Sequence, residues 1–123
     1  MSTGLTQLTS LMKWGADFLG AEYAIMAGAM SWVSERHLVS AMSNAGGFGV
    51  IACGAMTVDL LDKEIAATKE RTDKPFGVNL ITMHPDLDAL IELCGRHKVG
   101  HVVLAGGLPP GGMPPSPRNT YQY

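Results

Sequence analysis

Two apolar runs separated by an amphipathic stretch open the hydrophobic pattern of this chain. Residues 23–27 form the first run and residues 48–53 the second, and each is typical of a strand buried on both faces. The residues between them predict one helix, so the segment 23–54 predicts a strand–helix–strand unit. Because the crossover is short, the two strands should pair in parallel with the helix packed against them.

The predicted helix has recognisable ends. Ser34 is a residue type that accepts hydrogen bonds from the free amides at a helix start, so we predict a helix capped by Ser34 and running through Asn44. The glycines at 46–47 should end it, because glycine tolerates the left-handed conformation that such an end requires. The apolar positions that share one face of this helix are Leu38, Met42 and Ala45.

Two further helix–strand alternations follow. The predicted elements are a helix capped by Thr57 and running to about Arg71, a strand at 76–81, a helix with Pro85 in its first turn, and a strand at 102–105. The apolar positions that share one face of the helix that starts with Pro85 are Leu87, Leu90, Ile91 and Cys94. The centres of the four predicted strands lie 25, 28 and 25 residues apart, near Ile25, Val50, Val78 and Val103. Strands that alternate with helices at this spacing predict an α/β fold with four parallel β/α units. Residues 1–22 precede these units and predict a short helix or plug.

Four such units are half of a (β/α)8 TIM barrel, which takes about 250 residues. We therefore predict that residues 1–108 are the amino-terminal half of a TIM barrel; a four-stranded open sheet is the structural alternative. Residues 107–123 hold five prolines and three glycines without any periodicity. Since proline forbids helix, we predict that residues 109–123 are a disordered Pro/Gly-rich tail.

The composition argues against several classes of binding partner but does not indicate a reaction. The 123 residues carry a net charge of −2 with a pI near 6.0, which gives no electrostatic reason to expect nucleic acid or an anionic membrane. No run approaches the length of a membrane span, so we expect a cytoplasmic chain. Four scattered histidines do not make a metal site. The two cysteines, Cys53 and Cys94, fit small core residues that stay reduced.

Four motifs occur in order between residues 19 and 110: MAGAMSWVSE, SNAGGFGVIACGAM, RTDKPFGVNLI and VVLAGG. Together they resemble the nitronate monooxygenases, formerly called 2-nitropropane dioxygenases. They resemble equally the flavin-dependent enoyl-ACP reductases that share the fold. The resemblance implies a TIM barrel with one FMN at its carboxyl face. It also implies an oxidoreductase, a flavoprotein monooxygenase that oxidises alkyl nitronates or nitroalkanes with O2.

The resemblance also implies which residues contact the cofactor. Gly28, Ala29, Met30 and Ser31 would meet the flavin through their backbone, and Asn79 would hydrogen-bond the flavin or its ribityl chain. Alternatively, the loop is only a tight turn, and Asn79 is an interior amide satisfied by neighbouring backbone. The glycines at 46–49 precede a strand instead of following one, so they predict helix termination and not a dinucleotide site.

Other parts of the family site are not encoded. The family's catalytic histidine and FMN-phosphate loops follow later strands. None of the four histidines of this chain matches the catalytic motif; they are His37, His84, His97 and His101. We therefore assign no catalytic residue and expect a truncated form with weak or absent FMN binding. Two alternatives remain: an enoyl-ACP reductase relative that also uses a pyridine nucleotide, and a catalytically inactive fragment. Such a fragment would self-associate through its open sheet edges.

Overall fold

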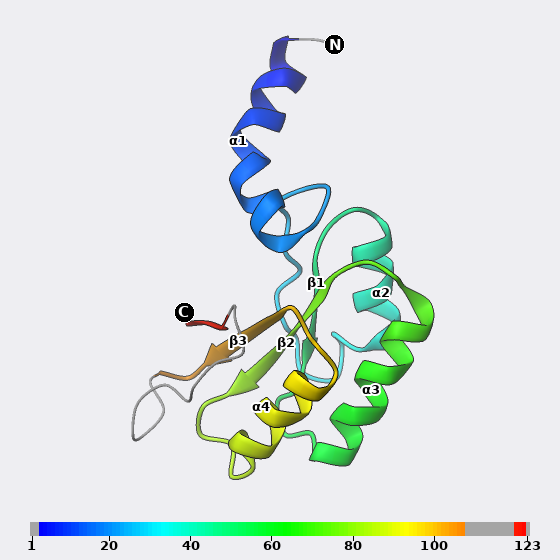
Figure 1. The fold of residues 1–123 in the computed structure, drawn as a ribbon, viewed down its shortest axis with the longest axis vertical. Helices are drawn as coiled ribbons and strands as arrows, with labels where there is room; N and C mark the ends of the chain where they lie inside the picture. Colours follow the sequence, from blue (N-terminus) through cyan, green and yellow to red (C-terminus); the bar gives the residue numbers. More distant parts are fainter. Residues whose placement is uncertain (1–2, 108–119, 123) are drawn as a thin grey trace.

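A four-stranded parallel sheet forms the centre of the molecule (Figure 1). The structure is a computed structural model that describes residues 3–107 and 120–122. The strands follow one another across the sheet in chain order, β1-β2-β3-β4, with no reversal. Their bounds are Gly49–Ala52 for β1, Phe76–Ile81 for β2, His101–Ala105 for β3 and Thr120–Gln122 for β4.

Three helices cover one face of this sheet. They alternate with the strands and are α2 (Arg36–Asn44), α3 (Val58–Arg71) and α4 (Leu87–Arg96). Val78 and Leu80 of β2 point toward them and join the buried core, as do Val102 and Leu104 of β3. Because side chains alternate along a strand, Asn79 faces the opposite side, level with Ala52 of β1 and Val103 of β3. The sheet thus has one face covered by these helices and one face that carries Asn79.

Much of this architecture was predicted correctly. Strand β2 has the predicted bounds, and β3 begins one residue before its predicted start. Helix α3 begins after Thr57, whose side chain accepts a hydrogen bond from the amide of Leu60. Helix α4 begins at Leu87, so Pro85 lies before its first turn and not in it. Three of its four predicted apolar positions are buried, Leu87, Leu90 and Cys94, whereas Ile91 is half-buried.

The start of α2 differs from the prediction. Its N-cap is Glu35 and not Ser34, because the Glu35 carboxylate accepts hydrogen bonds from the amides of His37 at 3.0 Å and Leu38 at 3.3 Å. Ser34 is bonded elsewhere, within the loop before the helix. The predicted glycine end is correct, since Gly46 has a φ of +96°.

The buried face of α2 also differs. The buried positions are Val39, Ser40 and Ser43, whereas Leu38 and Met42 are half-buried and Ala45 is exposed. Ser43 tolerates burial because its hydroxyl is fully used. Its Oγ donates to the carbonyl of Pro75 at 2.9 Å and accepts from the amide of Gly49 at 3.1 Å. The face of α2 that packs against β1 is therefore shifted by about one residue from the predicted face.

The predicted first strand is wrong in one respect. Residues 23–27 run parallel to β1 and bond Phe48 through Ile25 and Ala27, but the pairing amounts to an isolated bridge, Met26 to Phe48. Ile25 and Met26 are 54% and 41% exposed, so this segment is not buried on both faces. It lies at the edge of the described sheet, where no other described strand covers its outer side.

Most of the predicted tail lies outside the described residues, at 108–119 and 123. Residues 120–122 differ from the expectation of an irregular tail, because they form β4 and pair in parallel with β3, Val102 opposite Thr120. These three residues follow the last proline and include Thr and Tyr, which favour strands. The free edge of β3 supplies the backbone partners that such a segment needs.

Helix α1 (Thr3–Leu19) confirms the predicted leading helix and projects from one end of the sheet (Figure 1). None of its residues is fully buried. Its last turn is held by His101, whose Nε2 donates to the carbonyl of Phe18 at 2.9 Å. The His101 ring also lies edge-on to the rings of Phe18 and Phe48, with both centroid distances at 5.1 Å. Since His101 begins β3, α1 is attached at the amino-terminal ends of the strands.

We expect the 123-residue chain to self-associate because residues 23–27 leave an exposed apolar edge. Sedimentation velocity should show species that grow with concentration. Ile25→Lys should shift the distribution toward monomer, because a charge on an edge opposes strand pairing. Ala66→Lys adds the same charge on the exposed side of α3 and should leave the distribution unchanged. A single compact monomer over a wide concentration range, with a cooperative melt, would contradict this expectation.

Candidate functional site

The loop between residues 28 and 34 is closed by Ser34. The Ser34 amide donates to the carbonyl of Met30 at 2.8 Å, and its hydroxyl oxygen accepts from the Met30 amide at 2.9 Å. The same hydroxyl donates to the carbonyl of Gly28 at 3.3 Å. Ser34 is 2% exposed, so these bonds are shielded from water. The loop backbone therefore has one defined shape.

This loop lies at the carboxyl end of β1. The amide of Ala52, the last residue of β1, donates to the carbonyl of Ser34 at 3.0 Å. Two residues later Gly54 adopts a φ of +50°, and a Cβ added there would lie 3.2 Å from Ser31 Oγ. Ligands of parallel α/β proteins bind at the carboxyl ends of the strands, so the loop is in the position expected of a binding element.

Asn79 lies on the other side of the same strand end. Its carbonyl accepts from the amide of Cys53 at 3.1 Å, directly after β1. The structure thus brings the two sequence-predicted parts of the site, the Gly28–Ser31 loop and Asn79, to opposite sides of the carboxyl end of β1.

The side chain of Asn79 has weak internal bonding. Its Nδ2 lies 3.5 Å from the carbonyl of Val103, at the limit of a hydrogen bond, and the residue is half-buried. An amide that neighbouring backbone fully satisfied would make shorter bonds. This geometry leaves the Asn79 amide able to bond a ligand on the face of the sheet that α2, α3 and α4 do not cover.

The backbone of the loop is accessible at Gly28. A Cβ added to Gly28 would meet nothing within 4 Å, so its backbone is open. The Met30 side chain is 49% exposed and offers an apolar contact beside that backbone.

The four histidines either lie away from the carboxyl end of β1 or make a hydrogen bond within a turn. His37 is exposed on α2, and His97 Nε2 lies 2.5 Å from Asp62 Oδ1 between α4 and α3. His101 holds α1 at the amino-terminal ends of the strands. His84 Nδ1 accepts a hydrogen bond from the amide of Asp86 at 3.0 Å. These placements agree with the interpretation of the four histidines as solvated or structural.

Both cysteines are buried and free, as predicted. Burial raises the pKa of Cys53 to about 11 and that of Cys94 to about 12. Their thiols are therefore protonated at neutral pH and are poor nucleophiles. Within residues 3–107 and 120–122, no group of three His, Cys, Asp or Glu side chains is arranged to hold a metal ion.

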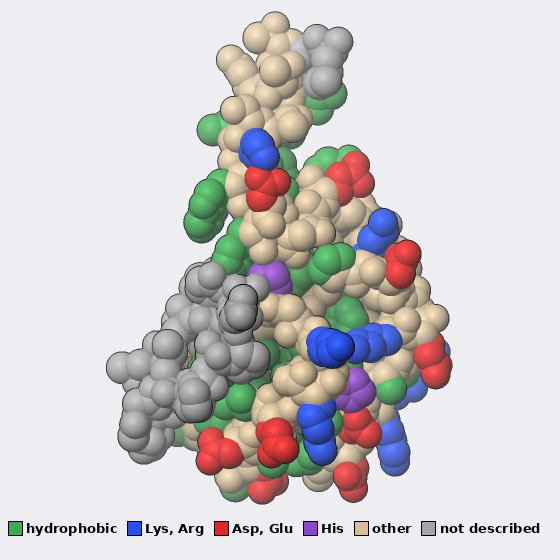
Figure 2. All heavy atoms as spheres, in the orientation of Figure 1, with side chains coloured by type: hydrophobic (Ala, Val, Ile, Leu, Met, Phe, Trp, Pro, Cys, Tyr) green, Lys and Arg blue, Asp and Glu red, His purple; other side chains and the backbone are tan. Residues whose placement is uncertain are grey.

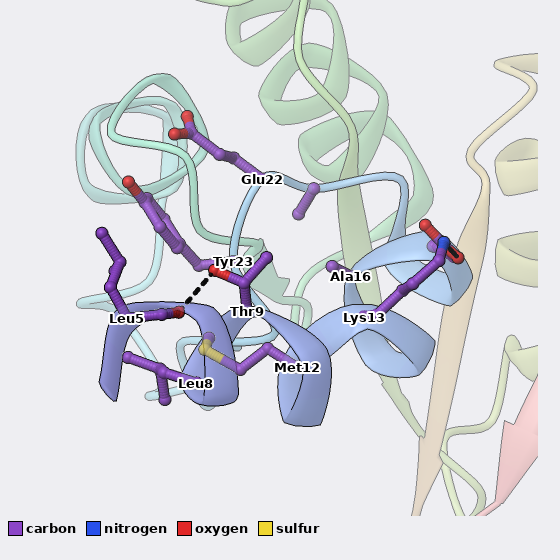
Figure 3. Close-up of a pocket in the computed structure, with 10 residues that line it drawn as sticks. Leu5, Leu8, Thr9, Met12, Lys13, Ala16, Glu22 and Tyr23 are labelled. Carbon is purple, nitrogen blue, oxygen red and sulfur yellow. Dashed lines mark hydrogen bonds and ion pairs between the residues drawn. The ribbon is translucent and has the colours of Figure 1, made fainter. Parts of the chain in front are cut away.

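A cavity of about 510 Å³ opens between α1 and the segment Ala21–Tyr23 (Figure 3). Leu5, Leu8 and Met12 line one side, and the Tyr23 ring lies across from them. The cavity belongs to the α1 end of the molecule, at the amino-terminal ends of the strands, and not to the Gly28–Ser31 loop. In barrels that end serves stability and not catalysis, so we do not assign the active site there.

Sequence reasoning missed two features near the loop and one beyond it. Trp32 has a φ of +63°, which bulky residues rarely adopt, and Ser34 forms the loop closure. Thr82, directly after β2, has a buried hydroxyl without a hydrogen-bond partner. A positive φ at tryptophan has no sequence signature, whereas the residue spacing from Gly28 to Ser34 could have suggested a side-chain closure of the loop.

Comparison with known proteins identifies the family. The model of the nitronate monooxygenase family matches residues 12–104. The chain belongs to this family. The resemblance of the four sequence motifs is thereby confirmed, and the match includes both the Gly28–Ser31 loop and Asn79.

Individual relatives carry different names. The chain is 41% identical over 83 residues to a (3aS,4S,5R,7aS)-5-hydroxy-7a-methyl-1-oxo-octahydro-1H-indene-4-carboxyl-CoA dehydrogenase of Mycobacterium tuberculosis, covering 68% of this chain and 23% of that protein. It is 40% identical over 75 residues to a nitronate monooxygenase of Paraburkholderia phytofirmans, covering 60% and 20%. The structure of FabK from Thermotoga maritima matches with 42% identity and a TM-score of 0.73, covering 75% and 30%.

The chain therefore spans about a fifth to a third of the length of these relatives. No helix in the described part of the chain has the length and apolar character needed to cross a bilayer.

Proposed function

We propose that this chain contains the part of an FMN-dependent oxidoreductase of the nitronate monooxygenase family that contacts the flavin ring. The observation that carries the proposal is the placement of the Gly28–Ser31 loop and Asn79 on opposite sides of the carboxyl end of β1. Nitronates or nitroalkanes and O2 are the proposed substrates of the intact enzyme. FMN, when bound, supplies the two-electron chemistry.

The fold supports a partial (β/α)8 barrel as the scaffold. Consecutive strands lie in chain order, and α2, which precedes β1, covers the same face as α3 and α4, which connect the next strands. A barrel has both features, whereas a doubly wound sheet reverses its order and carries helices on both faces. The face that carries Asn79 would then be the barrel interior.

The residues of this chain have positioning roles in the proposed site. The Gly28 backbone lets the ring approach, and the Asn79 amide donates to an acceptor atom on the ring or ribityl chain. The shape of the loop, set by Ser34, fixes where the ring rests against β1. The resemblance implies that the phosphate-binding loops and the catalytic base of the family follow later strands, which these residues do not include.

A reductase or dehydrogenase is the second candidate function. The identities to the named CoA-ester dehydrogenase and to FabK are 41% and 42%, as high as the 40% to the named nitronate monooxygenase. Such an enzyme would bind FMN through the same loop and would pass electrons between a pyridine nucleotide and an acyl thioester instead of from a nitronate to O2. The third possibility is a catalytically inactive fragment that performs neither reaction. Titration of the chain with FMN tests this possibility.

We expect the 123-residue chain to bind FMN more weakly than micromolar, because charge-assisted bonds to the phosphate, each about 1.5–3 kcal/mol, are not supplied here. Titration followed by flavin fluorescence should give a shallow, saturable curve. Asn79→Ala should weaken binding about tenfold, since one hydrogen bond is lost.

Gln7→Ala removes an amide from the exposed side of α1 and serves as the control, with no expected change. No saturable binding at any concentration would favour an inactive fragment. Sub-micromolar binding at one FMN per chain would show that the phosphate is held here after all.

A further inference from the structure

We propose that Trp32 determines substrate specificity by contacting the apolar part of the substrate, and that Ser34 positions it. This inference rests on the proposed function, since it assigns a substrate-facing role within the same loop. The Trp32 indole is 70% exposed, and the residue belongs to the loop at the carboxyl end of β1.

The backbone of Trp32 is the first argument. Its φ of +63° lies in the left-handed region, which costs a bulky residue roughly 1–2 kcal/mol and costs glycine almost nothing. An exposed tryptophan recovers little of this through packing. A strained residue without a packing role is retained more readily where the strain serves a contact with a ligand.

The bonds around Trp32 hold it in this form. The amides of Val33 and Ser34 both donate to the carbonyl of Met30, at 3.0 Å and 2.8 Å, so the turn that contains Trp32 is closed twice. The Ser34 hydroxyl adds its bonds to Met30 and Gly28 on the inner side. Trp32 is thus presented outward from a rigid loop.

The neighbouring side chains indicate the chemistry of the ligand. Met30 and Val33 are 49% and 53% exposed beside Trp32, and residues 28–33 carry no charge. These three apolar side chains belong to the loop at the carboxyl end of β1, which is where parallel α/β proteins bind small-molecule ligands. The matching ligand is a small organic compound with an apolar chain or ring attached to its reacting group.

Nitroalkanes test this contact directly, because a nitro group quenches indole fluorescence on contact. The chain has two tryptophans, Trp14 and Trp32, 80% and 70% exposed. Trp14→Phe leaves Trp32 as the reporter at the proposed site, and Trp32→Phe leaves Trp14 on α1 as the matched control. Each variant is titrated with nitroethane, 1-nitrobutane and 1-nitrohexane.

We expect saturable quenching of Trp32, with a half-saturation concentration that falls about twofold per added methylene, because part of each methylene is buried. Trp14 should show linear quenching without chain-length dependence. Ser34→Ala should raise the half-saturation concentration for Trp32 severalfold. Linear quenching of Trp32 that matches Trp14 would overturn the proposal.

The stability of a second variant separates a ligand contact from a structural role. Trp32→Asn should raise the urea midpoint, because asparagine adopts the left-handed conformation more readily than tryptophan and does not add the freedom of glycine to the unfolded chain. A lower midpoint would show that the fold needs the indole and would overturn the proposal. These readouts do not involve FMN, so a failed FMN titration would refute the proposed cofactor without deciding the role of Trp32.

Discussion

Replacing Gly49 by alanine is expected to lower the free energy of unfolding by about 3 kcal/mol, at the upper end of overpacking effects. A Cβ at this position would lie 2.4 Å from the carbonyl oxygen of Val39 and 2.8 Å from its Cα. Both atoms belong to the backbone of α2, so no side-chain rotation relieves the contact. The helix would have to move away from β1.

The consequence of that movement extends to the candidate site. The α2–β1 contact includes the Ser43 hydroxyl, which accepts from the Gly49 amide and donates to Pro75, directly before β2. Displacing α2 breaks these bonds and moves the loop that precedes the helix. Urea denaturation monitored by circular dichroism measures the loss.

Gly95→Ala is the matched control. Gly95 lies inside α4, and a Cβ there would meet nothing within 4 Å. Alanine should stabilise the helix by up to about 1 kcal/mol. Equal destabilisation by both substitutions would show that the close approach of α2 to β1 is not the cause.

The hydrophobic periodicity correctly predicted the elements that are defined by residues within their own segment. Helix α3 and strand β2 have their predicted bounds because a threonine cap, a periodic apolar face and a proline turn all lie within the segment itself. The family resemblance located the loop and Asn79. The alternation of side chains along β2 then agrees with an amide on the face that the three helices leave uncovered.

The features that the sequence did not predict depend on distant residues. Ser34 and Glu35 are both able to cap a helix, and the choice follows from the bonds of Ser34 to Met30 and Gly28. The buried face of α2 follows from Ser43, whose partner Pro75 lies 32 residues away. Local patterns hold no information about such partners, so cap and face were each misplaced by about one residue.

The edge segment at 23–27 shows the same limit. Its apolar residues predicted a buried strand, and apolar composition does report a tendency to be buried. Burial nevertheless requires a neighbour on each side, and the described sheet supplies only Phe48 and the residues around it. Ile25 and Met26 are therefore exposed because no described segment covers the outer side of residues 23–27.

The second large effect concerns the ion pair between α2 and α3. Glu64, 7% exposed, accepts hydrogen bonds from the amide of Arg36 at 3.2 Å and from its Nε at 3.1 Å, and pairs with the guanidinium. Glu64→Gln removes the charge and keeps the shape of the side chain. The loss should be about 2 kcal/mol, between the roughly 1 kcal/mol of exposed pairs and the 3–5 kcal/mol of buried ones.

The same carboxylate predicts a pH dependence. The Arg36 side-chain hydrogen bonds hold the pKa of Glu64 below its ordinary value of 4.5, and this effect outweighs the opposing effect of burial. A carboxyl whose pKa is lowered by folding stabilises the folded state above its unfolded pKa. That contribution is lost as the pH falls through the lower, folded value. The stability of the native chain should therefore decline below about pH 4.5.

Urea midpoints measured between pH 7 and pH 3 give the test. Glu64→Gln should be less stable than the native chain at pH 7, and the difference should shrink toward pH 3, where the native carboxyl becomes protonated. Asp17→Asn is the control, because the Lys13–Asp17 pair on α1 is 72% and 65% exposed and should contribute little at any pH. A Glu64→Gln difference that stays constant across this range would show that the carboxylate stabilises the chain through packing and not through its charge.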